Sequence, residues 1–160
     1  MPSVFFRKSF LDEIGYFDES SFTLTAADSE LVQRALLLGR SAFIPKVISS
    51  YRVWSGSLTN NTIASKHWLD EIDIWTSKIT KLANATLTKK QNIFNWSRYK
   101  DEIYARNLLG GLSNLYNLKN YHKLFHYYSE ARYPKNAFLK TKLRIWKILI
   151  LSKLKTLNVN

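Results

Sequence analysis

Asp28 is the residue whose type and position best suit acid–base chemistry, because it opens a segment, residues 28–38, whose apolar periodicity predicts a helix. A carboxylate can accept a proton from a hydroxyl group that lies within hydrogen-bond reach. An aspartate that caps a helix is held in place and can project into a cleft. The structural alternative is that Asp28 is only an N-cap, aided by Glu30 near the positive helix end. Spacing alone favours the cap, and one residue can fill both roles.

Two arginines and a tryptophan are candidate substrate-binding residues. Arg34 follows Asp28 by six positions, so their side chains do not share a helix face; Arg34 could reach a phosphate, or be a surface or packing residue. Arg52 ends an expected strand, and strand ends face clefts in α/β sheets. The structural alternative for Arg52 is a salt bridge to the acids at positions 18 and 19. Trp54 could stack on a sugar or a base, or pack in the core.

Helices and short strands are expected to position these residues in the first part of the chain. A helix over 8–14 is expected to end at Gly15, since glycine readily takes the left-handed conformation that ends helices. The helix over 28–38 is expected to end at Gly39. Apolar and aromatic runs predict three short strands, over residues 3–7, 41–44 and 47–53. Residues 1–60 are therefore expected to form a short partial sheet with one to two helices.

From residue 62 onward, apolar residues recur at helical spacing. The expected helices cover about residues 62–82, 89–109, 121–132 and 136–157. Gly110 and Gly111 are expected to interrupt or kink the second of these helices. The acidic cluster at 70–73 is interpreted as a solvated helix face. The predicted fold class is α+β, mostly α, with a C-terminal helical region over residues 61–160.

Three segments in the first sixty residues together carry a family resemblance. They are SVFFRK (3–8) followed by IGYFDE (14–19), then ADSELVQR (27–34) with a glycine beyond, then YRVWSGSLT (51–59). In this order and at these intervals they resemble the acceptor-side part of family-two inverting glycosyltransferases of GT-A type. The resemblance implies an incomplete GT-A-like core, with Asp28 as the general base and Arg52, Arg34 and Trp54 contacting substrate. Residues 61–160 resemble the family only as a variable helical tail.

The resemblance also shows what this sequence lacks. Many relatives have histidine where Trp54 stands, and tryptophan has no lone pair for a metal, so no metal assistance is expected from that position. The family's donor half carries an Asp–x–Asp motif that holds a divalent cation against the sugar nucleotide; the chain contains neither this motif nor a Gly-rich phosphate loop. His122 and His126 are spaced for a metal, but no third ligand is near. No metal or cofactor is expected within this chain.

The expected function follows from that resemblance. The chain would be a fragment of an enzyme that transfers a sugar from a nucleotide-sugar donor to a glycan or lipid-linked acceptor, without the N-terminal nucleotide-binding half and inactive alone. The divalent cation and the nucleotide sugar would bind only with that half. The alternative is a non-enzymatic helical module that is membrane-peripheral or binds a partner.

The charge of the chain is concentrated at its C-terminal end. Of the 24 Lys and Arg residues, eight lie in residues 131–160, which contain none of the twelve acids. Residues 136–157 therefore predict a basic amphipathic helix that could lie on an anionic membrane surface. The alternative is a core-capping helix with a solvated basic side; nucleic acid is not expected as a partner, since no recognised motif supports it. The absence of cysteine suits a reducing cytoplasm. We expect the protein to be located in the cytoplasm, at the inner face of the membrane.

Overall fold

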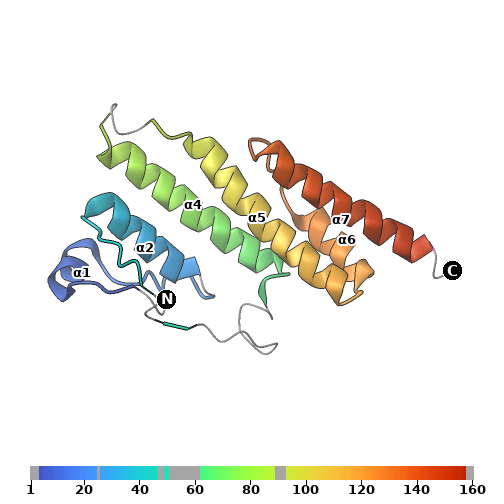
Figure 1. Ribbon diagram of the computed structural model, residues 1–160, viewed down its shortest axis with the longest axis horizontal. Coiled ribbons are helices and arrows are strands. Elements are labelled where there is room, and N and C mark those ends of the chain that lie inside the picture. Colours follow the sequence, from blue (N-terminus) through green and yellow to red (C-terminus); the bar gives the residue numbers. More distant parts are fainter. Residues whose placement is uncertain (1–3, 25, 47–48, 51–61, 89–92, 158–160) are drawn as a thin grey trace.

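The computed structural model describes residues 4–24, 26–46, 49–50, 62–88 and 93–157, and within these ranges all regular structure is helical. The helices, shown in Figure 1, are α1 (Lys8–Ile14), α2 (Ala26–Leu38), α4 (Lys66–Thr86), α5 (Trp96–Asn117), α6 (Tyr121–Glu130) and α7 (Leu139–Leu157). No helix among the described residues combines the length and the apolar character that crossing a membrane requires.

The four longer helices form a layer. Helix α4 packs between α2 and α5, and α5 packs in turn against α7. Helix α6 contacts both α5 and α7, while α1 contacts α2. As a result, α1 and α2 lie at one edge of the layer and α7 lies at the opposite edge (Figure 1).

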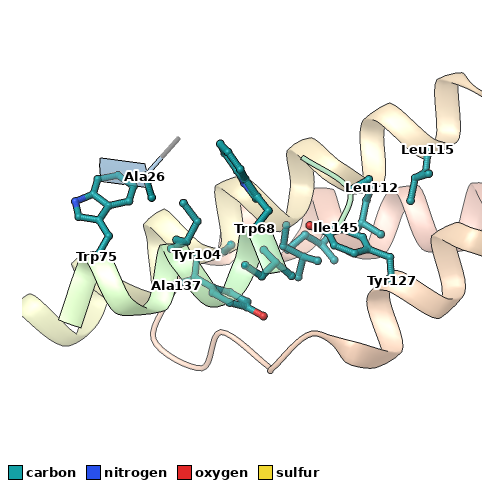
Figure 2. Close-up of a cluster of buried hydrophobic side chains, with 14 of the residues drawn as sticks. Ala26, Trp68, Trp75, Tyr104, Leu112, Leu115, Tyr127, Ala137 and Ile145 are labelled. Atoms are coloured by element: carbon teal, nitrogen blue, oxygen red, sulfur yellow. The ribbon is translucent and has the colours of Figure 1, made fainter. Parts of the chain in front are cut away.

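The core is aromatic and aliphatic, and it is built around one face of α4. Trp68, Ile72, Trp75 and Ile79 recur at spacings of four, three and four residues, and all are buried. This spacing places them on one side of a helix, as the sequence predicted. Figure 2 shows members of the same cluster contributed by other elements, among them Ala26, Tyr104, Leu112, Tyr127 and Ile145. The core therefore joins the α2 edge to the α7 edge without a break.

The predicted partial sheet is wrong. Residues 4–7 and 41–44 are described and contain no strand, and apart from residues 49 and 50 the third predicted strand lies outside the described residues. Phe5 and Phe43, the centres of the two apolar runs, are 82% and 88% exposed. An apolar run has strand propensity, but a strand also needs a neighbouring backbone to complete its hydrogen bonds. No such neighbour exists in the described part, so the fold class α+β is corrected to all-α there.

Helix boundaries at the N-terminal edge follow the sequence closely. Helix α1 covers the predicted residues, and Gly15 follows it with a φ of 87°, a backbone conformation that favours glycine. Helix α2 begins two residues before the predicted start and ends before Gly39, whose amide donates to the carbonyl oxygen of Ala35 at 2.9 Å.

The predicted interruption at Gly110 and Gly111 is wrong, because α5 runs straight through both residues. A β-carbon added at Gly111 would lie 2.6 Å from both a ring carbon and the hydroxyl oxygen of Tyr127, and 2.7 Å from the carbonyl oxygen of Ile63. Tyr127 of α6 is buried and donates a hydrogen bond from its hydroxyl to that same carbonyl at 3.1 Å. Gly111 therefore allows close packing of α5 against Tyr127 and Ile63.

Replacing Gly111 by Ala should destabilise the fold by about 1–3 kcal/mol, because overpacking against Tyr127 and the Ile63 backbone outweighs the helix propensity that alanine adds. Gly110→Ala is the matched control, since its β-carbon would meet only the flexible end of the Ile63 side chain at 3.1 Å. That variant should be neutral or more stable by up to about 1 kcal/mol. Urea unfolding followed by circular dichroism measures both. Equal stability of the two variants would contradict the packing role.

Candidate active site at the start of α2

Asp28 is the third residue of α2 and lies within its first turn, so the expectation that it occupies the N-cap position is corrected. The residue is half-buried. Its carboxylate accepts a hydrogen bond from the Ser29 hydroxyl at 3.2 Å. The first turn of a helix presents backbone N–H groups and a partial positive charge, both of which favour a carboxylate. Asp28 therefore places a carboxyl group at the start of α2, beside the Ser29 hydroxyl.

The segment that leads into α2 is fixed by a buried glutamate from α4. Oε1 of Glu71 accepts hydrogen bonds from the backbone N–H groups of Thr23 and Leu24, at 2.6 and 2.7 Å, and from the Thr23 hydroxyl at 3.2 Å. The Thr23 hydroxyl also lies 2.7 Å from Nε2 of His67. Only 1% of Glu71 is exposed, so interpreting the 70–73 cluster as a solvated face was wrong for this residue.

Glu71 and His67 were missed as site residues because their role depends on a contact across more than forty positions of sequence. The one available signal was that Glu71 stands directly before Ile72, within the apolar stripe of α4. A carboxylate bordering such a stripe is a candidate for burial, and a buried carboxylate requires hydrogen-bond donors. The backbone before α2 supplies those donors.

Arg34 connects α2 to the end of α1. Its guanidinium donates to both carboxylate oxygens of Glu30, at 2.9 and 3.0 Å, and to the carbonyl oxygens of Ile14, Gly15 and Tyr16. The distances to the Gly15 and Tyr16 oxygens are 3.0 and 2.7 Å. These contacts match the packing role considered for Arg34. The structure does not bring Arg34 toward Asp28, and substrate binding by this residue stays a prediction.

Gln33, which precedes Arg34, fixes the other side of α2. Its side-chain oxygen accepts hydrogen bonds from Nε1 of Trp75 on α4, at 3.1 Å, and from the hydroxyl of Tyr99 on α5. Burial raises the pKa of Tyr99 to about 12, so its hydroxyl keeps its proton near neutral pH and donates it to Gln33. Sequence reasoning did not single out Gln33. These bonds join α2 to α4 and α5.

Arg52 and Trp54, the two remaining predicted substrate contacts, lie outside the described residues. Asp18, considered as a partner of Arg52, accepts a hydrogen bond from Nζ of Lys78 on α4, and the alternative with Arg52 stays a prediction. This bond, together with those from Ser20 and Ser21, holds the pKa of Asp18 well below its usual value. The loop before α2 is thus tied to α4 at two points, through Asp18 and through Thr23.

The chemistry available at this site is proton acceptance by one carboxylate. Among the residues that the structure describes, no three His, Cys, Asp or Glu side chains group closely enough to hold a metal ion. His126, one of the metal-spaced histidines, instead lies beside Glu130, with Nδ1 and Oε2 3.2 Å apart. Comparisons with family models, with curated proteins and with solved structures found no match for this chain.

Proposed function

We propose that residues 3–60 are the acceptor-side part of an inverting glycosyltransferase and that Asp28 is its general base. The observation that carries the proposal is a half-buried carboxylate in the first turn of α2, on a helix held by contacts with α1, α4 and α5. A base must be held within hydrogen-bond reach of the hydroxyl it serves. A helix anchored to three neighbours meets that requirement better than a loop. The motif resemblance in residues 3–60 supplies the reaction class.

In the proposed reaction, Asp28 accepts the proton of an acceptor hydroxyl as that oxygen attacks the anomeric carbon of the donor sugar. The bond from the anomeric carbon to the diphosphate breaks, and the nucleoside diphosphate leaves with the electron pair. The acceptor is a glycan or a lipid-linked sugar. In the family, a divalent cation neutralises charge on the leaving diphosphate. The sequence has no Asp–x–Asp motif and the described residues no metal cluster, so this chain is assigned only the proton acceptor.

Exposed apolar side chains in the N-terminal part support a second element of the proposal, a missing donor-binding half. The exposed large apolar residues described between 4 and 44 are Val4, Phe5, Tyr16, Phe17, Leu36, Leu38, Phe43 and Ile44. A concentration of exposed apolar residues is typical of a surface that another polypeptide covers. We propose that the donor-binding half of the enzyme covers these residues and that the chain is inactive without it.

Supplying a donor-binding half tests this proposal. The half to co-express is a donor-binding domain that carries an Asp–x–Asp motif. The chain alone should release no nucleoside diphosphate from a panel of nucleotide sugars with a sugar acceptor present. The co-expressed pair should release it in an acceptor-dependent manner. A pair that assembles but transfers no sugar from any donor of the panel would contradict the proposal.

The second candidate function is a non-enzymatic helical module that binds a membrane or a partner. The observation that favours it is the exposed apolar face of α7, at the edge opposite α2 (Figure 1). If the first proposal is correct, the enzyme would work in the cytoplasm at the inner face of the membrane, and both activities would belong to one molecule.

A further inference from the structure

Helix α7 leaves most of its large apolar side chains exposed. The residues that it buries against the bundle are Thr141, Ile145, Leu149 and Ser152, two of which are polar. The residues that remain exposed on the other side are Leu139, Leu143, Trp146, Ile150, Leu154 and Leu157, each between 49% and 68% exposed. Packing against α5 and α6 therefore does not account for the apolar character of this helix.

The six exposed residues form one continuous stripe, called here the outer stripe of α7. They follow one another at spacings of four, three, four, four and three residues, which keeps them on one side of a helix. At 1.5 Å per residue the stripe is about 27 Å long. Trp146 lies near its middle, and α7 forms one edge of the helical layer (Figure 1).

Positive charge borders the outer stripe on both sides. Helix α7 carries six basic residues and no acid: Lys140, Lys142, Arg144, Lys147, Lys153 and Lys155. At 100° per residue, Lys140 and Lys147 fall on one flank of the stripe and Lys142 and Lys153 on the other. A second copy of this chain is poorly suited to cover the outer stripe, since it would bring two sets of like charges together.

We propose that the outer stripe of α7 lies in the interface of a bilayer that contains anionic phospholipids. The apolar side chains would enter the boundary between headgroups and acyl chains, while the flanking lysines would reach the phosphates. The helix would lie in the membrane plane, and the α2 edge would point toward the aqueous phase (Figure 1). This inference does not rest on the transferase proposal, because vesicle binding is measured without catalysis.

Co-sedimentation of the full chain with vesicles tests the proposal. The chain should bind mixed phosphatidylglycerol and phosphatidylcholine vesicles at low salt, and raised salt should weaken the binding. The triple variant Leu143→Gln, Trp146→Gln, Ile150→Gln should bind at least about tenfold more weakly. The triple variant Lys140→Gln, Lys147→Gln, Lys153→Gln should bind mixed vesicles roughly a hundredfold more weakly and leave binding to pure phosphatidylcholine unchanged.

A matched control removes exposed apolar side chains from the opposite edge. The variant Leu36→Gln, Leu38→Gln, Phe43→Gln should bind mixed vesicles like the wild type, and all variants should keep the wild-type circular dichroism spectrum, because every replaced side chain is exposed. Failure of the wild type to bind mixed vesicles at low salt would overturn the proposal. Equal loss in the control variant would also overturn it, as would a wild-type dimer that the α7 apolar variant converts to a monomer.

Discussion

Replacing Asp28 by Asn should lower the rate of sugar transfer by the co-expressed enzyme by about 10²–10⁴-fold, the range that positioned general bases contribute. Asparagine has nearly the same shape, and its side-chain oxygen can still accept the Ser29 hydrogen bond seen at 3.2 Å. What it loses is the ability to take a proton from the acceptor. The loss should therefore fall on kcat, and the KM for the nucleotide sugar should change little, because the donor is bound by the other half.

Ser29→Ala is the matched control for this prediction. It removes the hydrogen bond to the Asp28 carboxylate and leaves the carboxylate in place, so kcat should stay within about tenfold of the wild type. Both variants should assemble with the donor half and unfold at the same urea concentration as the wild type. If Asp28→Asn transfers sugar at the wild-type rate, the residue is only a structural member of the first turn of α2. A loss of assembly without a specific loss of kcat would point the same way.

Replacing Arg132 by Met should destabilise the fold by about 2–4 kcal/mol, because it breaks a partly buried ionic network. The Arg132 guanidinium donates to both oxygens of Asp73, at 2.8–3.1 Å, and to Asp101 at 2.6 Å. It also lies 4.1 Å from the centre of the Tyr104 ring. Its loss leaves the Asp101 side chain, which is 10% exposed, without its cation. Because a third of the Arg132 side chain is exposed, the cost stays below that of a fully buried pair.

Arg106→Met is the control, since Arg106 pairs with Glu102 at 2.7 Å but 65% of its side chain is exposed. Exposed pairs contribute little, so this variant should lose less than about 1 kcal/mol. Glu102 also keeps two other donors, the Phe138 amide and the Thr141 hydroxyl. Urea unfolding at neutral pH measures both variants. If both variants lose the same stability, removal of a positive charge explains the loss, and the bridge that Arg132 makes between Asp73 and Asp101 does not.

The contribution of Asp101 should depend on pH. Burial raises the pKa of Asp101, but hydrogen bonds from the Asn136 backbone and from Arg132 outweigh burial, and the net pKa lies below the ordinary 3.8. A carboxyl whose pKa is lowered by folding stabilises the fold above its unfolded pKa and loses that effect as pH falls through the folded value. The stability difference between the wild type and Arg132→Met should therefore be complete near neutral pH and shrink below about pH 4.

The helices themselves were largely predictable, because helix formation depends on local spacing and on end signals. The stripe from Trp68 to Ile79 identified α4, and Gly15 marked the end of α1. The candidate base, Asp28, was also placed correctly within the first turn of a helix, although not as its cap. Its catalytic role stays a prediction, as do those of Arg34, Arg52 and Trp54.

The errors arose where long-range contacts decide the outcome. Residues 4–7 and 41–44 have strand propensity, but no backbone among the described residues pairs with them, and they contain no strand. The Gly110-Gly111 pair resembled a helix break, yet Gly111 is there because Tyr127 and Ile63 approach too closely for a β-carbon. Glu71 resembled a surface acid, yet it is buried, and its Oε1 accepts hydrogen bonds from two backbone amides before α2.

The sequence by itself predicted the helices to within about four residues, except α5, which begins seven and ends eight residues later than expected. It also predicted that the last helix is basic and amphipathic. Only the tertiary structure decided which face of each helix is covered. In α7, the side that carries Thr141 and Ser152 packs against the bundle, and the side that carries Leu143 and Trp146 stays exposed. The physical reason is that periodicity is a property of one segment, whereas burial requires the shape and chemistry of a second surface.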